Sequence, residues 1–369
     1  MANPEHVVDT EPGATSTDPV DIEDVRELTE GALRDFLAGQ ALQLDEISAD
    51  LRPLLDAARR MLGTGKRLRP AFCYWGWRGA GAEAGPEVVR AAAALELLQA
   101  SALIHDDVMD ASDTRRGQPS AHRGFERMHE IHGWLGSAAS FGTGAAILLG
   151  DLCLVWADEL FVGSGAEADA IMRAKPVYDE MRTELMSGQY LDLLVQARGE
   201  GEIDRLRQVI LYKSAKYTIE RPLHLGAALA GADPDLIHAY SAYGLPLGEA
   251  FQLRDDVLGV FGDPALTGKP AGDDIREGKR TVLLAIAQNQ AGPADAETLV
   301  RHLGNPDLDA DAVASVREAI VRTGALSEVE ARIDALTAES RAALAEAAMP
   351  EPARSVLDRL AVASTARRL

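Results

Sequence analysis

The sequence predicts an all-α protein, and three observations lead to that prediction. Apolar residues recur at helical spacing almost from end to end, in segments dominated by Ala and Leu. The alternation of Val, Ile and Thr that marks strands is missing, as are the Asn-Gly and Asp-Gly pairs that mark hairpin turns. A chain of 369 residues could form one large domain or two ordinary ones. The continuous periodicity favours a single domain of about ten or more helices.

The individual elements follow from this periodicity in chain order. Residues 1–20 are rich in Pro, Thr and acidic residues, so we expect a disordered segment followed by one domain over 21–369. Helical spacing begins near Ile22, and a helix over 51–62 ends at Gly63, a glycine stop signal. Further helices are predicted over 86–110, 138–161, 166–195, 203–231, 234–260, 280–290, 294–303, 309–323, 326–346 and 351–367.

Three interruptions separate or modify these helices. The polar stretch after residue 110 contains Gly117, Pro119 and Gly124, and no helix is predicted there. Pro222 lies inside the segment 203–231, where a proline kinks a helix. The segment 261–280 is rich in Gly, Pro and charged residues and lacks apolar periodicity. Because it directly follows an acidic pair, it is predicted to be a mobile lid rather than a linker.

The composition disfavours several classes of protein. The chain has 58 acidic and 37 basic residues, a net charge of −21, which makes nucleic acid and anionic membranes poor partners. Cys73 and Cys153 lie in apolar segments and give no disulfide framework, as expected of free thiols in the cytoplasm. The N-terminus lacks the features of a signal peptide, and Asp151 and Asp158 interrupt the most apolar window. We therefore expect a cytoplasmic protein without a transmembrane segment.

Two acidic clusters indicate the chemistry. Asp106, Asp107 and Asp110 form a DDxxD run, and a second pair follows at Asp255 and Asp256. Each cluster ends an apolar helical segment, and residues i and i+4 share one helix face. Facing carboxylates of this kind hold Mg²⁺ against a diphosphate, because Mg²⁺ prefers oxygen ligands and combines protein carboxylates with substrate phosphates. The alternative is a solvated acidic helix face. It does not explain the apolar approach to the first run or the arginine pair that follows it.

Basic residues stand out against this acidic background. Lys66, Arg67 and Arg69 follow the glycine stop, and arginine offers a planar fork for phosphate oxygens. Taken alone, the cluster is more typical of a basic surface loop. It predicts a second anion site when combined with Arg115, Arg116, Lys213, Lys269 and Lys279. Gln99 is a polar amide in an apolar helical stripe, which indicates either a ligand contact or a structural hydrogen bond.

These motifs resemble those of the polyprenyl synthetase family of trans-isoprenyl diphosphate synthases, which includes farnesyl and geranylgeranyl diphosphate synthases. The matching segments occur in the family's order and are GKRLRP (65–70), ELLQ (96–99), DDVMD (106–110), TRRG (114–117), LLGD (148–151), GQYLDL (188–193), YKSAKY (212–217), FQLRDD (251–256) and GDPALTGKPAGDDIREGKRT (262–281). The resemblance implies a single helical isoprenoid synthase bundle around a central cavity, in which isopentenyl diphosphate is condensed with an allylic diphosphate.

The resemblance also assigns roles to individual residues. Three Mg²⁺ ions are implied to be bound by Asp106, Asp110 and Asp255, with Asp107 and Asp256 beside them. The allylic substrate (dimethylallyl, geranyl or farnesyl diphosphate) is implied to contact Arg115, Lys213 and Lys269. Isopentenyl diphosphate is implied to contact Lys66, Arg69, Gln99 and Arg116. Further substrate-binding positions are Gln189, Asp192, Ser214 (where relatives usually have Thr), Gln252 and Lys279.

One position departs from the family. The second aspartate run lacks its third carboxylate because Gly259 stands there. Asp255 is retained, so we expect weaker organisation of water around the metal rather than loss of metal binding. Three nearby residues are candidates to substitute for the missing group: Asp263, Asp273 and Asp274.

Small residues before the first run predict the product length. Ser101 and Ala102 lie about one helical turn before Asp106 and Leu98 about two turns before it. A turn advances about 5.4 Å, close to the length of one prenyl unit. Farnesyl-specific relatives often carry aromatic residues at the first of these marks. The small side chains therefore predict elongation past C15 to geranylgeranyl diphosphate, with farnesyl diphosphate and products of C25 or longer as the alternatives.

Partners and competing functions complete the expectations. Family members pair as homodimers, and the apolar segment 138–161 is a candidate contributor to such an interface. A class I terpene cyclase would need a second motif containing Asn or Asp, Ser or Thr, and Glu, which FQLRDDVLGVFGD lacks. A cyclase or a head-to-head synthase also has no use for GKRLRP, and a regulatory subunit would be expected to have lost an aspartate run.

Overall fold

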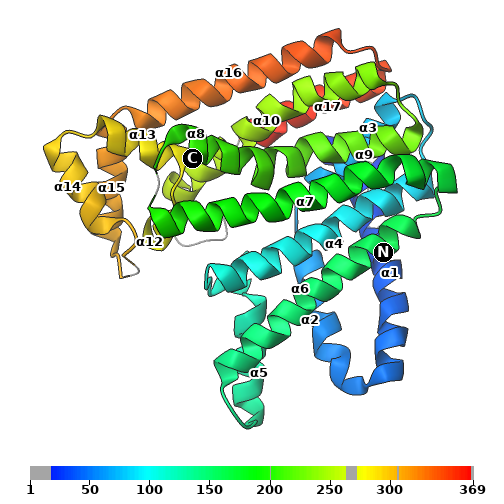
Figure 1. Cartoon of the computed structure of the whole chain (residues 1–369), viewed down its shortest axis with the longest axis horizontal. Coiled ribbons are helices and arrows are strands. Elements are labelled where there is room, and N and C mark those ends of the chain that lie inside the picture. Colours follow the sequence, from blue (N-terminus) through cyan, green and yellow to red (C-terminus); the bar gives the residue numbers. More distant parts are fainter. Residues whose placement is uncertain (1–17, 200, 263–271, 306, 367–369) are drawn as a thin grey trace, which may run out of the picture.

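A computed structural model describes residues 18–199, 201–262, 272–305 and 307–366, and these residues are almost entirely helical (Figure 1). The first half of the chain contains η1 (Pro19–Asp24), α1 (Val25–Ile47), η2 (Ala49–Leu51), α2 (Arg52–Leu62), α3 (Leu68–Gly79), α4 (Pro86–Met109), α5 (Ala121–His132), α6 (Ala138–Val162) and α7 (Ala168–Arg198). A hairpin of β1 (Thr114–Arg115) and β2 (Gln118–Pro119) connects α4 to α5.

The second half continues with α8 (Ile203–Val209), η3 (Ile210–Glu220), α9 (Arg221–Ala230), α10 (Pro234–Phe261), α12 (Asp273–Glu277), α13 (Val282–Gln290), α14 (Pro293–His302), α15 (Ala310–Arg322), α16 (Ala325–Glu346) and α17 (Glu351–Thr365). The prediction of an all-α fold is confirmed. The helices predicted over 51–62, 86–110, 138–161 and 234–260 agree with α2, α4, α6 and α10 to within one residue at each end.

The long helices α4, α7, α10 and α16 run along the long axis of one bundle, and α5 and the α1–α2 pair project from one side of it (Figure 1). Three apolar clusters fill the interior. The first joins α1, α2, α4, α6 and α7, the second joins α10, α13, α15 and α16, and the third joins α3, α9, α10 and α17. Helix α4 lies deep in the first cluster, since four consecutive alanines from Ala91 to Ala94 are at most 1 % exposed. Small side chains of this kind let neighbouring helices approach closely.

The segment predicted as one helix over 203–231 consists of three successive parts. Its middle part, η3, is a π-helix, a wider form that is rare and frequent at functional sites. Pro222 lies in the first turn of α9, directly after η3, so the change from π-helix to α-helix falls at the proline. Two glycines make room for η3. A Cβ at Gly188 of α7 would lie 2.8 Å from the Lys213 Cα, and one at Gly248 of α10 would lie 2.9 Å from the Ala215 carbonyl carbon.

Two helices, α5 and α12, lie where the sequence predicted no helix. Helix α5 occupies the polar stretch around Gly124, and it forms because His122, Phe125 and His129 give it one buried face. The short helix α12 lies within the segment predicted to be a lid, whose residues 263–271 are outside the described part of the chain. Pro19 and Val20, which were predicted to belong to the disordered N-terminal segment, are buried in η1.

One described helix, α4, is long and apolar enough to cross a membrane, but 72 % of its apolar window is buried inside the protein. Burial of this extent is typical of the core helix of a folded bundle. Cys73 and Cys153 are both buried free thiols, as the sequence predicted.

Candidate active site

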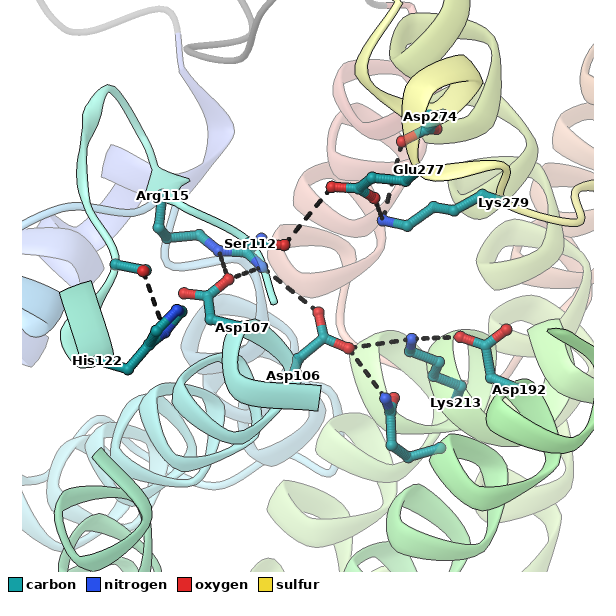
Figure 2. A network of polar contacts seen from close by, with 12 residues as sticks. Asp106, Asp107, Ser112, Arg115, His122, Asp192, Lys213, Asp274, Glu277 and Lys279 are labelled. Atoms are coloured by element: carbon teal, nitrogen blue, oxygen red, sulfur yellow. Dashed lines mark hydrogen bonds and ion pairs between the residues drawn. The ribbon is translucent and has the colours of Figure 1, made fainter. Parts of the chain in front are cut away.

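The first aspartate run occupies the last turn of α4, where Asp110 caps the helix and donates its backbone N–H to the Asp106 carbonyl at 2.8 Å. The Asp106 side chain lies between basic groups from two directions (Figure 2). Its Oδ1 atom is 3.3 Å from the Lys213 ammonium, and its Oδ2 atom is 3.4 Å from the Arg115 guanidinium. The Gln189 amide donates to Oδ1 at 3.0 Å. A residue of the first run is thus already surrounded by groups that bind anions.

Lys213 connects Asp106 to a further carboxylate. It projects from the π-helix η3, and its ammonium also donates to Asp192 of α7 at 2.7 Å. Ser214, the next residue on η3, is buried. Four predicted residues, Asp106, Gln189, Asp192 and Lys213, therefore come together from α4, α7 and η3.

The arginine pair after the first run is divided by the β-hairpin. Arg115 ends β1 and Arg116 opens the turn, and both turn residues, Arg116 and Gly117, have positive φ values of 53° and 73°. A turn with positive φ at both central positions joins two strands tightly and reverses the chain. Arg115 points to Asp106 and Asp107, donating to Asp107 Oδ1 from Nε at 2.8 Å and also from Nη2. Arg116 points to the loop after α2, where it donates to the Thr64 hydroxyl at 2.8 Å.

The second group of anion-binding candidates comes from the basic loop, with Gln99 of α4 beside it as a neutral amide. Arg69 donates to the Thr218 hydroxyl at 2.8 Å and stacks over the Tyr217 ring at 4.3 Å. Lys66 is exposed, and Gln99 is half-buried on α4. Burial lowers the pKa of Arg116, and the neighbouring Arg115, Arg67 and Arg69 lower it further, so these arginines share one positively charged region.

Arg67 has a structural task within the basic loop. It is 2 % exposed and donates to Glu96 of α4 at 2.6 Å and to the Thr64 carbonyl at 3.2 Å. Its φ of +54° fixes the turn that leads into α3. Because its charge is paired within the protein, Arg67 holds the loop in shape, and Lys66 and Arg69 remain as the anion-binding candidates of the GKRLRP segment.

The charges of the first run are set by burial and by its neighbours. Burial raises the pKa of Asp106, but Lys213 and Arg115 outweigh this effect and hold the pKa below its usual value. Burial raises the pKa of Asp107 in spite of its hydrogen bond from Arg115. Burial, followed by the charge of Asp106, raises the pKa of Asp110 to about 6. The protein therefore ionises Asp106 most readily, which is the state a metal ligand needs.

The second aspartate run lies near the C-terminal end of α10. Burial raises the pKa of Asp256 to about 8, although Gln252 donates a hydrogen bond to its Oδ1 at 2.8 Å. Asp255 is half-buried one residue before it. The position of the missing third carboxylate, Gly259, faces Asp274 of α12.

Lys279 lies between the two runs. Its ammonium is 3.0 Å from Glu277 and 3.8 Å from Asp274. Burial lowers its pKa, but the charges of Asp274, Glu277 and Asp106 outweigh burial and raise it. Its contacts are with Asp274 and Glu277, both from α12 (Figure 2), and the charge of Asp106 on α4 also acts on it. Lys269 and Asp263 lie outside the described residues, and so does the side chain of Asp273.

The arrangement of carboxylates fits magnesium bound together with a diphosphate. Within the described residues, no three carboxylate, His or Cys side chains form a closed metal-binding group. Mg²⁺ usually takes one or two protein carboxylates and completes its shell with water and substrate phosphates. Two separate acidic groups with lysines and arginines between them are the donor set expected for that mode of binding.

Sequence reasoning missed several residues that support the site. Glu277 pairs with Lys279 and accepts a hydrogen bond from the Ser112 hydroxyl at 3.5 Å. Tyr217 and Thr218 orient Arg69. Glu277 could have been recognised in the sequence, because it is an acidic residue two positions before Lys279. No pattern in the sequence indicates the contacts of Tyr217 and Thr218, because they depend on how η3 packs against α3.

The predicted chain-length residues lie in the interior along α4. Leu98 and Ser101 are fully buried and Ala102 is half-buried. The Ser101 hydroxyl has no hydrogen-bond partner among the described residues. Both residues at the first turn before Asp106 are therefore small, and Ala102 packs against the first apolar cluster.

The fold and these paired acidic groups define a prenyltransferase with the isoprenoid synthase fold. The chain belongs to the polyprenyl synthetase family, whose sequence model, described as Polyprenyl synthetase, matches residues 51–320. It is thus a trans-isoprenyl diphosphate synthase by family.

Relatives and solved structures agree with this assignment. A geranylgeranyl pyrophosphate synthase from Corynebacterium glutamicum, complexed with isoprenyl diphosphate and magnesium, is 43 % identical; the match covers 93 % of this chain and 99 % of that one, with a TM-score of 0.90. A geranylfarnesyl diphosphate synthase from Aeropyrum pernix is 33 % identical over 73 % of this chain and 79 % of its own length. A geranylgeranyl diphosphate synthase from Mycobacterium tuberculosis is 32 % identical over 79 % of this chain and 77 % of its own.

Proposed function

We propose that the protein catalyses the Mg²⁺-dependent head-to-tail (1′–4) condensation of isopentenyl diphosphate with allylic diphosphates and that its product is geranylgeranyl diphosphate. The observation that carries the proposal is the division of the arginine pair by the hairpin. Arg115 faces the aspartate run and Lys213, and Arg116 faces the GKRLRP loop. Two anion sites joined by one turn are what an enzyme needs to hold two diphosphates next to each other.

The mechanism follows from the charges. Departure of diphosphate from the allylic substrate leaves a delocalised carbocation, and Arg115 and Lys213 stabilise the departing negative charge. Asp106, Asp110 and Asp255 would hold Mg²⁺, which would supply Lewis acidity toward the same leaving group. Lys66, Arg69, Arg116 and Gln99 hold isopentenyl diphosphate so that its double bond attacks the cation.

The last step is loss of a proton from the new chain. The released diphosphate is the acceptor in this proposal, so no side chain of the protein serves as the general base. Water would quench the cation, and the apolar walls of α4 and its neighbours keep it away from the reacting carbons.

The activity is tested by incubating the protein with labelled isopentenyl diphosphate and, in separate reactions, dimethylallyl, geranyl or farnesyl diphosphate. Chain elongation that requires Mg²⁺ is the expected result, and chromatography of the products gives their length. Cyclic hydrocarbons formed from a single substrate, without consumption of isopentenyl diphosphate, would instead identify a class I terpene cyclase.

The proposed product length rests on Ser101, Ala102 and Leu98. In this proposal the growing prenyl chain extends from Asp106 back along α4, past the two small residues and toward Leu98. Its final length is then C20. The similarity to geranylgeranyl synthases supports this length, and the similarity to a geranylfarnesyl synthase keeps C25 as the second candidate. Replacing Ser101 and Ala102 together by Phe should shift the product to farnesyl diphosphate. An unchanged product would show that the growing chain does not pass these residues.

A homodimer is part of the proposal. Helix α6 exposes Phe141, Leu148, Val155 and Val162 by 37 %, 63 %, 62 % and 49 %, and these residues recur at intervals of seven. Residues seven apart lie on one helix face, and an exposed apolar stripe of this kind is typical of a contact between helices. Light scattering should give twice the monomer mass of 39.4 kDa, and Leu148→Glu should shift it toward the monomer. We assign the protein to the cytoplasm, since its two cysteines are free thiols.

A further inference from the structure

The space left by the missing third carboxylate of the second run is filled from another element. A Cβ built on Gly259 would overlap Oδ2 of Asp274 and lie 3.1 Å from its Oδ1. Asp274 belongs to α12, fifteen positions further along the chain, and its side chain is 10 % exposed. Any side chain at position 259 would therefore displace the Asp274 carboxylate. The α10 surface at Gly259 is a seat for a carboxylate that does not belong to α10.

Contacts that do not involve this carboxylate hold α12 in place. Ile275 is fully buried in the second apolar cluster, and its carbonyl accepts a hydrogen bond from the Gly304 N–H at 2.8 Å. Gly272 and Gly278 flank the helix with φ values of +72° and +68°, which glycine adopts without strain. A Cβ at Gly278 would lie 2.8 Å from the Gly304 Cα. The backbone around α12 is thus shaped to bring Asp274 to Gly259.

The carboxylate delivered in this way faces the site. Asp274 Oδ1 is 3.8 Å from Lys279, the lysine whose pKa is raised by Asp274 and Glu277 of α12 and by Asp106 of the first run. Figure 2 shows Asp274, Glu277 and Lys279 on the opposite side of the cluster from Asp107. Asp274 therefore stands beside the second run on the side that faces the first.

We propose that Asp274 is a positioning residue that replaces the third carboxylate of the second run, and that Gly259 is needed because it admits this carboxylate. The inference rests on the proposed function. It predicts that only one carboxylate fits between α10 and α12. Either residue 259 or residue 274 can supply it. Restoring Asp at position 259, as in the family's DDxxD pattern, would place two carboxylates in the space of one and weaken the site.

The test measures binding of Mg²⁺ with inorganic diphosphate to the full-length protein by isothermal titration calorimetry, which needs no turnover. Gly259→Ala and Asp274→Asn should each weaken this binding by about tenfold, the lower end of what loss of a group that supports a metal ligand costs. The double variant Gly259→Ala/Asp274→Asn should bind no more weakly than whichever single variant has the lower affinity, because both changes remove the same feature. Gly259→Asp should also weaken binding, and Gly259→Asp combined with Asp274→Ser should return it to within about threefold of the parent, as expected if the two positions are coupled.

Matched controls separate this effect from general damage. Gly39→Ala changes a glycine in α1 that has open space around it, and Asp235→Asn changes an exposed aspartate in the first turn of α10. Both should bind like the parent, and thermal unfolding identifies any variant that does not fold. If Gly259→Ala does not fold, the role of Asp274 is still tested by Asp274→Asn and by comparing Gly259→Asp with Gly259→Asp/Asp274→Ser.

Two results would overturn the inference: parent-like binding by Asp274→Asn, or Gly259→Asp binding as tightly as the parent. These outcomes are distinct from failure of the proposed function, in which the parent does not elongate allylic diphosphates. A parent that elongates while its calorimetry is indifferent to both positions would refute the role of Asp274 alone.

Discussion

The two aspartate runs differ in how the protein balances their charge. Asp106 of the first run lies between Lys213 and Arg115, at 3.3 and 3.4 Å, and its pKa is held low. Asp256 of the second run accepts a hydrogen bond from the neutral amide of Gln252, and burial, with Asp274 and Asp255 nearby, raises its pKa to about 8. The protein's own cations therefore keep Asp106 ionised, although the pKa values of Asp107 and Asp110 beside it are raised. Burial among other carboxylates instead keeps Asp256 protonated up to about pH 8.

The largest expected effect removes a ligand from either run. Asp106→Ala and Asp255→Ala should each lower turnover by about 10³-fold or more, because the metal and the cations around it stabilise the leaving diphosphate electrostatically. Steady-state kinetics over a range of Mg²⁺ concentrations measures the loss. The different surroundings of the runs add a distinction: excess Mg²⁺ should recover part of the activity of Asp255→Ala and little of that of Asp106→Ala. The second change also removes one of the two carboxylates that pair with Lys213.

The metal assignment would fail if Asp106→Ala kept near-normal activity while still requiring Mg²⁺. Asp235→Asn, which alters an exposed aspartate of α10 away from the second run, is the control for a change of net charge.

A smaller effect should separate the two anion sites. Lys66→Ala, Arg69→Ala and Arg116→Gln should chiefly raise the KM for isopentenyl diphosphate, and Lys213→Ala should chiefly affect the allylic substrate. A rise of about 10- to 100-fold corresponds to loss of one charged hydrogen bond. Comparison of Arg115→Gln with Arg116→Gln is the most discriminating test, because these residues are adjacent in the chain and face different sites. Equal rises in both KM values for every variant would show that the sites are not separate.

Much of the site could be predicted because its residues are tied to helix ends. The acidic and basic residues interrupt long apolar segments, and spacing on one helix places Asp106 and Asp110 together. The starts of α4 and α10 were predicted closely because Pro86 and Pro234 begin these helices. Arg115 and Arg116 could be recognised as a pair, but their division between two sites depends on positive φ angles at Arg116 and Gly117 that no spacing reveals.

Other features could not be predicted because they depend on contacts between distant segments. The π-helix η3 is accommodated by Gly188 and Gly248, which lie on two different helices. The burial of Arg67 follows from Glu96, nearly thirty residues away. Asp274 was one of three candidates to substitute at Gly259, and its contact with this position depends on the packing of α12. Asp263 and the side chain of Asp273 lie outside the described residues.

The smallest expected effect concerns stability and tests the charge balance directly in protein freed of metal with EDTA. Asp256 has a pKa of about 8 in the folded state, and about 3.9 is usual for an unfolded chain. Between these values the folded state holds a proton that the unfolded state has released, so this group's stabilising contribution is lost as the pH rises from about 4 to about 8. Asp256→Asn cannot lose that proton. Relative to the parent, the variant should gain on the order of a few kcal/mol between pH 5 and pH 8, seen as an upward shift in Tm.

Asp106→Asn is the matched comparison for this prediction, because the pKa of Asp106 is shifted the other way. A lowered pKa gives a contribution that is present above about pH 4 and lost only as the pH falls through the folded-state pKa. Neutralising Asp106 also lowers the pKa of Asp110, which is about 6 in the parent, so the comparison is made above that value. The difference between Asp106→Asn and the parent should be flat from about pH 7 to pH 8, where that for Asp256→Asn slopes. Parallel profiles for all three proteins would mean that the pKa of Asp256 is not raised in the folded state, and the contrast between the two runs would be lost.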